Sequence, residues 1–276
     1  MKLATVRTGD GTRAARLTSG GYVLLDAPDV GALLAREDWA DEAASAGGEP
    51  RAVDASDLAP VVPRPGKVLC VGLNYRNHIL EMGRDLPEHP TLFAKFAEAL
   101  IGAGDDIQLA PESSAVDWEA ELTVVIGRTV RRASEQEASR AIAGFTIMND
   151  VTMRDWQFRT KEWLQGKTFE GTTPLGPVMV TPDELPGGVR PAVALTCRVD
   201  GEVMQKAETS DLVFDPVDLV RYASTVLTLR PGDVIATGTP GGVGHARKPP
   251  RYLSDGMTVV TEIGGIGRLE NTARTS

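Results

Sequence analysis

The stretch Asp117-Trp118-Glu119-Ala120-Glu121-Leu122-Thr123-Val124-Val125-Ile126 places acidic residues directly before a β-branched, apolar run. Such a run predicts a strand. Because residues i and i+2 of a strand point to the same face, Glu119 and Glu121 are expected to project side by side. Asp150 ends a second apolar run, residues 145–148, and could supply a third carboxylate to the same place.

A cluster of carboxylates has a physical cost that suggests a ligand. Carboxylates held close together repel one another and resist ionisation, and a bound cation would relieve this repulsion. Oxygen ligands suit Mg²⁺, Mn²⁺ or Ca²⁺. The chain has three histidines and no cluster of cysteine and histidine, so a zinc site is not indicated. The alternative is a set of solvated carboxylates at a strand edge, and spacing alone does not decide between the two.

Short strand-like runs dominate the chain from residue 67 onward, with few helical patches between them. The expected strands are residues 68–71, 122–126, 145–148, 177–180, 192–199, 234–236 and 258–263. The expected helices are residues 77–82, 135–141, 152–164 and 216–227. Asp200-Gly201 predicts a hairpin turn, because glycine tolerates positive φ. This pattern predicts a mainly β fold with short helices (α+β), folded into a barrel or roll.

The first sixty residues have a different texture. Two short strand-like pieces, residues 5–7 and 22–25, precede a segment rich in Ala, Asp and Glu, residues 27–57. Pro63-Arg64-Pro65-Gly66 then interrupts the chain. We therefore expect a small N-terminal α/β domain over residues 1–63 and a larger catalytic domain over residues 64–276.

A histidine and a glutamate follow the first strand of the larger domain. If the chain is helical from Asn77 onward, His78 and Glu81 are spaced i and i+3 and share one helix face. A carboxylate beside an imidazole raises its basicity, which suits removal of a proton from water. The alternative is an ordinary pair on a surface helix. Lys95 and Lys167 lie among apolar residues, and each either reaches solvent or holds an anion.

Composition and motifs exclude several classes of protein. A net charge of −9 without a basic run argues against a nucleic-acid binder. The apolar stretches are strand-sized, so no membrane span is expected. The N-terminus lacks a long apolar signal segment, and Cys70 and Cys197 are expected to be buried thiols, so a cytoplasmic protein is expected.

Two glycine-containing segments are not nucleotide-binding motifs. Gly166-Lys167-Thr168 lacks the upstream glycine of a phosphate-binding loop, since that position is Lys161. The segment of residues 236–244 is not followed by a helix signal, which excludes a dinucleotide-binding turn. Its consecutive backbone N–H groups could still bind an anion.

Taken together, the motifs in the C-terminal three quarters of the chain resemble the fumarylacetoacetate hydrolase family. The resemblance runs from about Lys67 to Asn271. The motifs occur in the order of the family: residues 72–75 with His78 and Glu81, the Phe93/Lys95 segment, residues 117–121, 149–150, 154–157, 166–169 with 174–177, 237–240 and 266–271. Many members have a proline after the lysine at position 95, where this chain has Phe96, and this difference could alter the pocket wall.

The resemblance implies a fumarylacetoacetase-like fold, a homodimer and roles for particular residues. A divalent cation, commonly Mg²⁺, is implied on Glu119, Glu121 and Asp150. The implied catalytic residues are His78, Glu81 and Lys167. The residues implied or expected to contact the substrate are Tyr75, Arg76, Lys95, Gln157 and Thr239.

The implied activity is a Mg²⁺-dependent hydrolase that cleaves a carbon–carbon bond in a 1,3-diketo acid such as an acylpyruvate or fumarylpyruvate, as in aromatic catabolism. The metal would stabilise an enolate while His78, assisted by Glu81, activates water. The same site could instead decarboxylate oxaloacetate, or isomerise or decarboxylate a diacid of the 2-hydroxyhepta-2,4-diene-1,7-dioate type. A non-catalytic, metal-dependent keto-acid binding protein is a further alternative, and the intact pair of His78 and Glu81 argues against it.

Overall fold

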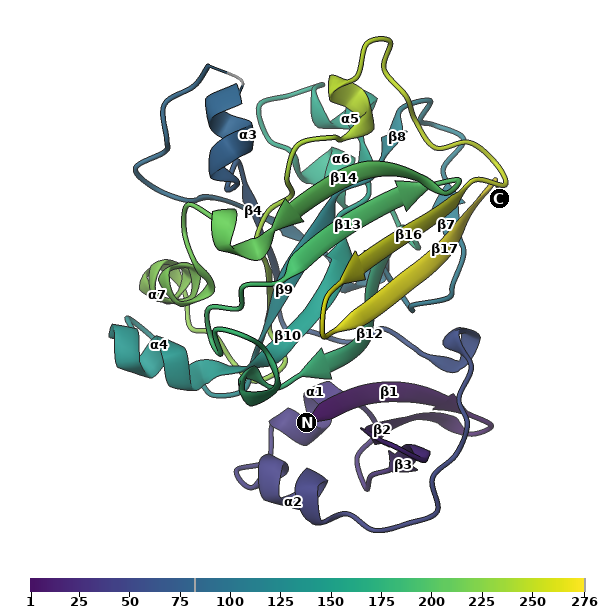
Figure 1. The fold of residues 1–276 in the computed structure, drawn as a ribbon, viewed down its shortest axis with the longest axis vertical. Helices are drawn as coiled ribbons and strands as arrows, with labels where there is room; N and C mark the ends of the chain where they lie inside the picture. The colour runs from purple at the N-terminus through teal and green to yellow at the C-terminus, as the bar shows by residue number, and fades with distance from the viewer. Residues whose placement is uncertain (82, 276) are drawn as a thin grey trace.

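Two β-sheets packed on each other form the body of the protein (Figure 1). The computed structural model describes residues 1–81 and 83–275, apart from the side chain of Glu81. The large sheet has ten strands, in the order β3 (Gly21–Leu24), β2 (Gly11–Thr18), β1 (Lys2–Thr8), β12 (Thr173–Val180), β10 (Ile142–Asn149), β9 (Ala120–Ile126), β15 (Val234–Ala236), β4 (Val68–Gly72) and β5 (Thr91–Lys95), with β6 (Leu100–Ile101) paired to β12.

The small sheet has five strands and lies over the middle of the large one (Figure 1). Its order is β14 (Glu202–Glu208), β13 (Ala194–Val199), β16 (Thr258–Ile263), β17 (Gly267–Thr275) and β7 (Ile107–Leu109). A separate two-stranded pair joins β8 (Val116–Asp117) and β11 (Thr152–Met153). The turn between β13 and β14 contains Asp200 at φ 50° and Gly201 at φ 80°, which confirms the predicted hairpin.

The helices are short. They are α1 (Val30–Leu34), α2 (Trp39–Ser45), α3 (Arg76–Glu81), α4 (Glu135–Ala141), α5 (Arg154–Gln157), α6 (Leu164–Lys167) and α7 (Pro216–Val226). Short 3₁₀ turns are Ala55–Asp57, Ala97–Ala99, Pro182–Glu184, Thr209–Asp211 and Gly244–Ala246. Helix α7 begins where Asp215 accepts hydrogen bonds from the first-turn N–H groups and a proline occupies the first helical position. No described helix is long and apolar enough to cross a lipid bilayer.

The central strands β9 and β10 are buried on both faces, which explains why their sequences are largely apolar. Leu122 and Val124 belong to the core between the two sheets. Val125 instead packs on the opposite face, in the core that includes Leu33 of α1. The face that a residue covers therefore follows the strand period of two.

The predicted helix over residues 152–164 is wrong. The segment contains β11, the single-turn helix α5 and a loop, and α6 begins only at Leu164. The chain turns back because α6 packs closely on α5: a Cβ on Gly166 would lie 2.4 Å from the Gln157 backbone nitrogen. Local helix propensity did not reveal this reversal.

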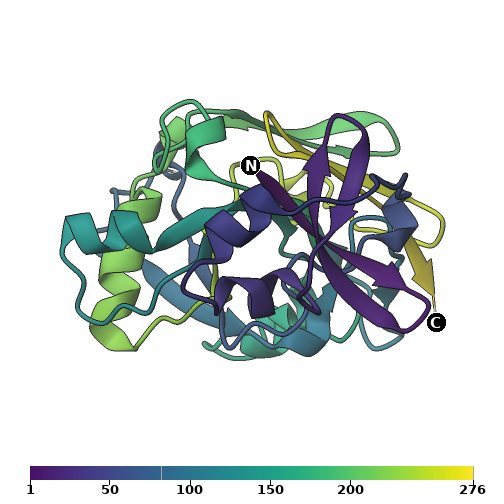
Figure 2. The same cartoon turned by 90° about the horizontal axis from the view of Figure 1, so that it is seen from below.

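The mainly β fold class is confirmed, and the sheets are open rather than closed into a barrel. The N-terminal strands join the large sheet, because β1 pairs with β12 through Lys2 opposite Val180 and Leu3 opposite Met179. Seen from below, the N-terminal strands and helices lie nearest the viewer (Figure 2). The other end of the molecule carries α3, α5 and α6 (Figure 1). A domain boundary at residue 63 stays a prediction.

Candidate metal centre and active-site cavity

Antiparallel pairing of β9 with β10 brings the three carboxylates of the sequence analysis together. The register sets Glu121 opposite Met148, so the start of β9 lies beside the end of β10. The Asp150 N–H donates to the Glu119 carbonyl at 2.8 Å, and the Glu119 N–H donates to the Asn149 side-chain oxygen at 2.9 Å. Carboxylate oxygens of Glu119, Glu121 and Asp150 lie within 4.8 Å of one another, and all three residues are buried.

Two buried lysines neutralise part of this charge. Lys167, at the end of α6, donates to Glu119 at 2.6 Å and to Asp150 at 2.8 Å. Lys95, at the end of β5, donates to the other Asp150 oxygen at 2.7 Å. Burial by itself raises the pKa of Asp150, but the two ammonium groups outweigh it and the pKa falls below its usual value. Neither lysine reaches solvent, so the alternative of a solvated ammonium is wrong for both.

A buried arginine completes the cluster, although the sequence analysis did not select it. Arg154 contacts Glu119 at 2.6 Å through Nη2 and Asp117 at 2.8 Å through Nε. Its Nη1 donates to the Gln157 side-chain oxygen at 2.9 Å. A signal was available in the sequence, because this arginine lies between Asp150 and Gln157, which were both selected.

Glu121 differs from its two neighbours, because no ion pair among the described residues involves it. Its Oε2 accepts a hydrogen bond from the Gly238 N–H at 2.8 Å. Burial raises the pKa of Glu121 well above its usual value, and the charges of Asp150 and Glu119 raise it further. A hard divalent cation prefers oxygen donors of this kind and would favour the ionised form. The donor set therefore fits Mg²⁺ or Mn²⁺.

A cavity of about 320 Å³ opens onto the carboxylate cluster. Its polar lining includes Glu119, Glu121, Arg154, Lys167, Arg84, His78 and His245. Its apolar lining includes Val71, Leu73, Phe93, Phe158, Trp163 and Val243. A few convergent charged groups in a partly apolar cavity are typical of a site for a small organic ligand.

Four of the residues predicted to act on the substrate line this cavity: His78, Gln157, Lys167 and Thr239. Lys95 lies beneath it, against Asp150. The His78 ring packs against the glycine-rich loop, where a Cβ on Gly241 would lie 2.8 Å from Nδ1.

The glycine-rich loop does present backbone N–H groups to anions, as the sequence suggested. The anions are carboxylates of the protein itself, since Gly238 donates to Glu121 and Gly244 donates to Asp117 at 2.7 Å. The loop therefore supports the cluster from the side of β9.

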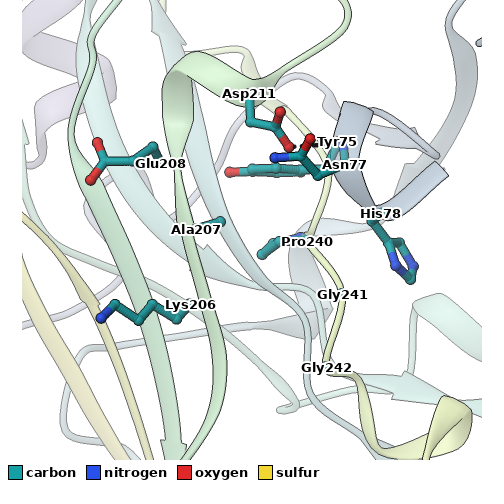
Figure 3. Close-up of a pocket in the computed structure, with 10 residues that line it drawn as sticks. All are labelled: Tyr75, Asn77, His78, Lys206, Ala207, Glu208, Asp211, Pro240, Gly241 and Gly242. Carbon is teal, nitrogen blue, oxygen red and sulfur yellow. Dashed lines mark hydrogen bonds between the residues drawn. The ribbon is translucent and has the colours of Figure 1, made fainter. Parts of the chain in front are cut away.

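A second cavity of about 540 Å³ also borders His78. Figure 3 shows the Tyr75 ring beside Asn77 and Asp211, with the His78 ring directed away from them. The Tyr75 side chain is buried, and its hydroxyl has no hydrogen-bond partner among the described residues. Arg76 is exposed and lines neither cavity. Tyr75 and Arg76 thus lie outside the cavity that opens onto the carboxylates.

The backbone of α3 places His78 and Glu81 one helical turn apart, as predicted. The side chain of Glu81 lies outside the described residues, so its contact with His78 stays a prediction.

Lys167→Met is expected to destabilise the metal-free protein by about 3–5 kcal/mol, because it leaves two buried carboxylates without their shared ammonium group. Urea unfolding in EDTA measures this change. Lys161→Met is the matched control, since Lys161 is exposed and should change stability by less than about 0.5 kcal/mol. Equal free energies of unfolding for the two variants would contradict the proposed contribution of the buried ion pairs to stability.

Known proteins resemble both the sequence and the fold. The family described as fumarylacetoacetate (FAA) hydrolase C-terminal matches residues 67–274. "Oxaloacetate tautomerase FAHD2A, mitochondrial" from Bos taurus is 47% identical over 218 residues, which cover 78% of this chain and 68% of the relative.

Two solved structures are also similar. Fumarylacetoacetate hydrolase (EaFAH) from psychrophilic Exiguobacterium antarcticum has a TM-score of 0.88 and 32% identity, with 100% of both chains covered. Fumarylpyruvate hydrolase from Pseudomonas aeruginosa, in complex with Mn²⁺ and pyruvate, has a TM-score of 0.68 and 29% identity, with 77% of this chain and 91% of that chain covered.

Proposed function

Since this chain belongs to the fumarylacetoacetate hydrolase family, we propose that it is a divalent-metal-dependent enzyme that acts on small 2-keto acids through their enol forms. The observation that carries this proposal is the buried cluster of Glu119, Glu121 and Asp150 at the floor of a cavity that His78 also lines. Enolisation is favoured by an electrophile at the keto oxygen and a base at the adjacent carbon, and a cation on the carboxylates together with His78 would supply both.

Glu119, Glu121 and Asp150 would hold Mg²⁺ or Mn²⁺. When bound, such an ion would polarise the keto oxygen of a 2-keto acid and make the adjacent carbon more acidic. Lys167 and Arg154 hold the carboxylates in place through their ion pairs. Gln157 and Thr239 would orient the substrate beside the apolar wall of the cavity.

The first candidate reaction is tautomerisation of oxaloacetate. It is supported by relatives with this name that are up to 47% identical over about 218 residues. His78 would take a proton from the carbon between the keto and distal carboxylate groups. A proton is then added to the former keto oxygen, so that the reaction is an isomerisation without net gain or loss.

The second candidate reaction is hydrolysis of an acylpyruvate, which the sequence motifs favoured. The structural similarity to a fumarylpyruvate hydrolase supports it. His78 would remove a proton from water, the hydroxide would add to the distal carbonyl, and the carbon–carbon bond would break to release a carboxylic acid and the enolate of pyruvate. The enolate carbon would then take up the proton held by His78 to give pyruvate. Glu81 would assist His78, if its side chain faces the ring. Decarboxylation of oxaloacetate needs the same enolate stabilisation but no attack by water.

A panel of substrates with Mg²⁺ or with EDTA tests these candidates. The panel contains oxaloacetate, acetylpyruvate and fumarylpyruvate, and the readouts are decay of enol ultraviolet absorbance and formation of pyruvate. A tautomerase accelerates enol decay of oxaloacetate without forming pyruvate, whereas a hydrolase forms pyruvate from the acylpyruvates. Pyruvate from oxaloacetate indicates decarboxylation. Absence of turnover with every substrate would favour a keto-acid binding protein.

Three further expectations belong to this proposal. A homodimer is expected from the family, and gel filtration with light scattering measures it. A cytoplasmic location is expected from the sequence, although the bovine relative is named as mitochondrial. A separable N-terminal domain over residues 1–63 would be tested by limited proteolysis near Pro63-Arg64.

A further inference from the structure

A buried aspartate connects the carboxylate cluster to the glycine-rich loop without lining the cavity. The Asp117 side chain is fully buried and accepts four hydrogen bonds. Its Oδ1 accepts from the N–H groups of Trp118 at 2.8 Å and Gly244 at 2.7 Å. Its Oδ2 accepts from Arg154 Nε at 2.8 Å and from the His245 N–H at 3.0 Å.

One of these donors, Arg154, also contacts the carboxylate cluster. With its Nε bound to Asp117, the planar guanidinium of Arg154 directs its two Nη atoms to Glu119 and Gln157. A planar group held at one nitrogen has little freedom at the others. The orientation of Glu119 therefore depends on Asp117 through Arg154.

The N–H groups of Gly244 and His245 tie the glycine-rich loop to Asp117. Gly244 fits tightly, since a Cβ there would lie 1.9 Å from the Arg251 carbonyl oxygen and 2.8 Å from Asp117 Oδ1. The next residue, His245, lines the cavity. The neighbouring Trp118 adds a second tie, because its Nε1 donates to the Gly242 carbonyl at 3.2 Å.

We propose that Asp117 is a positioning residue, whose carboxylate simultaneously holds Arg154 against Glu119 and the loop backbone at Gly244 and His245 against the cavity. Only a carboxylate meets this need, because both oxygens face N–H donors. Asp117→Asn would turn an NH₂ group toward two of those donors and lose their hydrogen bonds. The inference extends the proposed function, since it names a residue that orients the candidate metal ligands.

Hydrogen exchange of the metal-free protein tests the loop, independently of any activity. Asp117→Asn should accelerate amide exchange in a peptide containing Gly244 and His245 by about tenfold or more, because it removes the hydrogen bond from one of these N–H groups to a charged carboxylate. Asp233→Asn is the matched control. Asp233 is equally buried and bonds Lys67 at 2.8 Å, but it lines neither cavity. Unchanged exchange in Asp117→Asn, or equal acceleration in both variants, would overturn the proposal.

Calorimetric titration with Mn²⁺ tests the link to Glu119. Asp117→Asn and Arg154→Lys should each weaken binding by about 10- to 100-fold, as do other changes to groups that orient metal ligands. Asp233→Asn should bind as the wild type does. In the double variant the two losses should not multiply, because both changes break the same contact. Multiplying losses would contradict the coupling.

The outcomes separate this inference from the proposed function. If wild-type protein binds no Mn²⁺, the proposed metal centre fails, and the exchange experiment still decides the positioning role. If Asp117→Asn does not fold, Arg154→Lys alone decides it, since lysine keeps the charge near Glu119 but loses the Nε–H donor to Asp117. Wild-type Mn²⁺ affinity in Arg154→Lys would then overturn the proposal.

Discussion

His78→Ala is expected to lower turnover of the best substrate in the panel by about 10²- to 10⁴-fold, the usual contribution of a general base. His78 lines the cavity that opens onto the carboxylate cluster, and its ring rests on the loop at Gly241. Steady-state kinetics with saturating Mg²⁺ measure the loss. The effect should appear mainly in kcat, because alanine leaves the proposed metal ligands untouched.

The same variant distinguishes the candidate reactions. Tautomerisation and hydrolysis both require proton removal by His78 and should collapse, whereas decarboxylation should decline less, since it begins with loss of CO₂. His89→Ala is the matched control, because His89 stacks on Tyr222 and does not line the cavity. If His78→Ala kept the wild-type kcat for tautomerisation or hydrolysis, His78 would not be the general base of that reaction.

Glu121→Gln is expected to abolish measurable binding of Mg²⁺ or Mn²⁺ while stabilising the metal-free protein. Glutamine keeps an oxygen that can accept from the Gly238 N–H, but it removes a carboxylate that is buried without an ion pair among the described residues. Calorimetry measures the first effect, and urea unfolding in EDTA measures the second. Glu262→Gln, an exposed change on β16, should alter neither quantity.

The stabilisation by Glu121→Gln should depend on pH. The folded-state pKa of Glu121 lies well above the usual 4.5, so the folded protein holds this proton more tightly than the unfolded chain does. Wild-type stability in EDTA is therefore lost as pH rises from 4.5 through the raised pKa, with a slope of up to about 1.4 kcal/mol per pH unit. Asp150 acts in a separate window, because its lowered pKa removes stability only as pH falls below 3.8.

The advantage of Glu121→Gln over wild type should thus grow with pH in EDTA and reverse when Mn²⁺ is added. If the difference in free energy of unfolding between Glu121→Gln and wild type stayed constant as pH rises from 4.5, ionisation of Glu121 would cost the folded protein little. A variant that still binds Mn²⁺ with wild-type affinity would exclude Glu121 as a ligand.

Local sequence was sufficient to predict the parts of the site that depend on strand geometry. The strand period of two predicted that Glu119 and Glu121 would project together, and their carboxylate oxygens do lie within 4.8 Å of each other, although β9 begins at Ala120 and Glu119 precedes it. The β-branched runs marked β9 and β10, and the Asp200-Gly201 turn marked the hairpin between β13 and β14. The ordered motifs then identified the family and the third carboxylate, Asp150.

Tertiary structure decided which charges meet these carboxylates. Lys95 and Lys167 come from β5 and α6, far along the chain from Asp150, and their ion pairs exist only because the sheet order and the reversal between α5 and α6 bring them there. Sequence spacing carries no information about such contacts, since each is set by long-range packing. Arg154 was not selected although it lies between Asp150 and Gln157 in the sequence, because only the fold shows its contacts with Asp117 and Glu119.

Neighbours in sequence also proved to be poor guides to the cavity. Tyr75 and Arg76 lie close to His78 along the chain, yet one is buried in the second cavity wall and the other is exposed. The sequence by itself indicated the central strands, the neighbouring pair of glutamates and the family. Only the tertiary structure decided the role open to Asp117, because hydrogen bonds from Arg154 and from a loop more than a hundred residues away converge on it through folding alone.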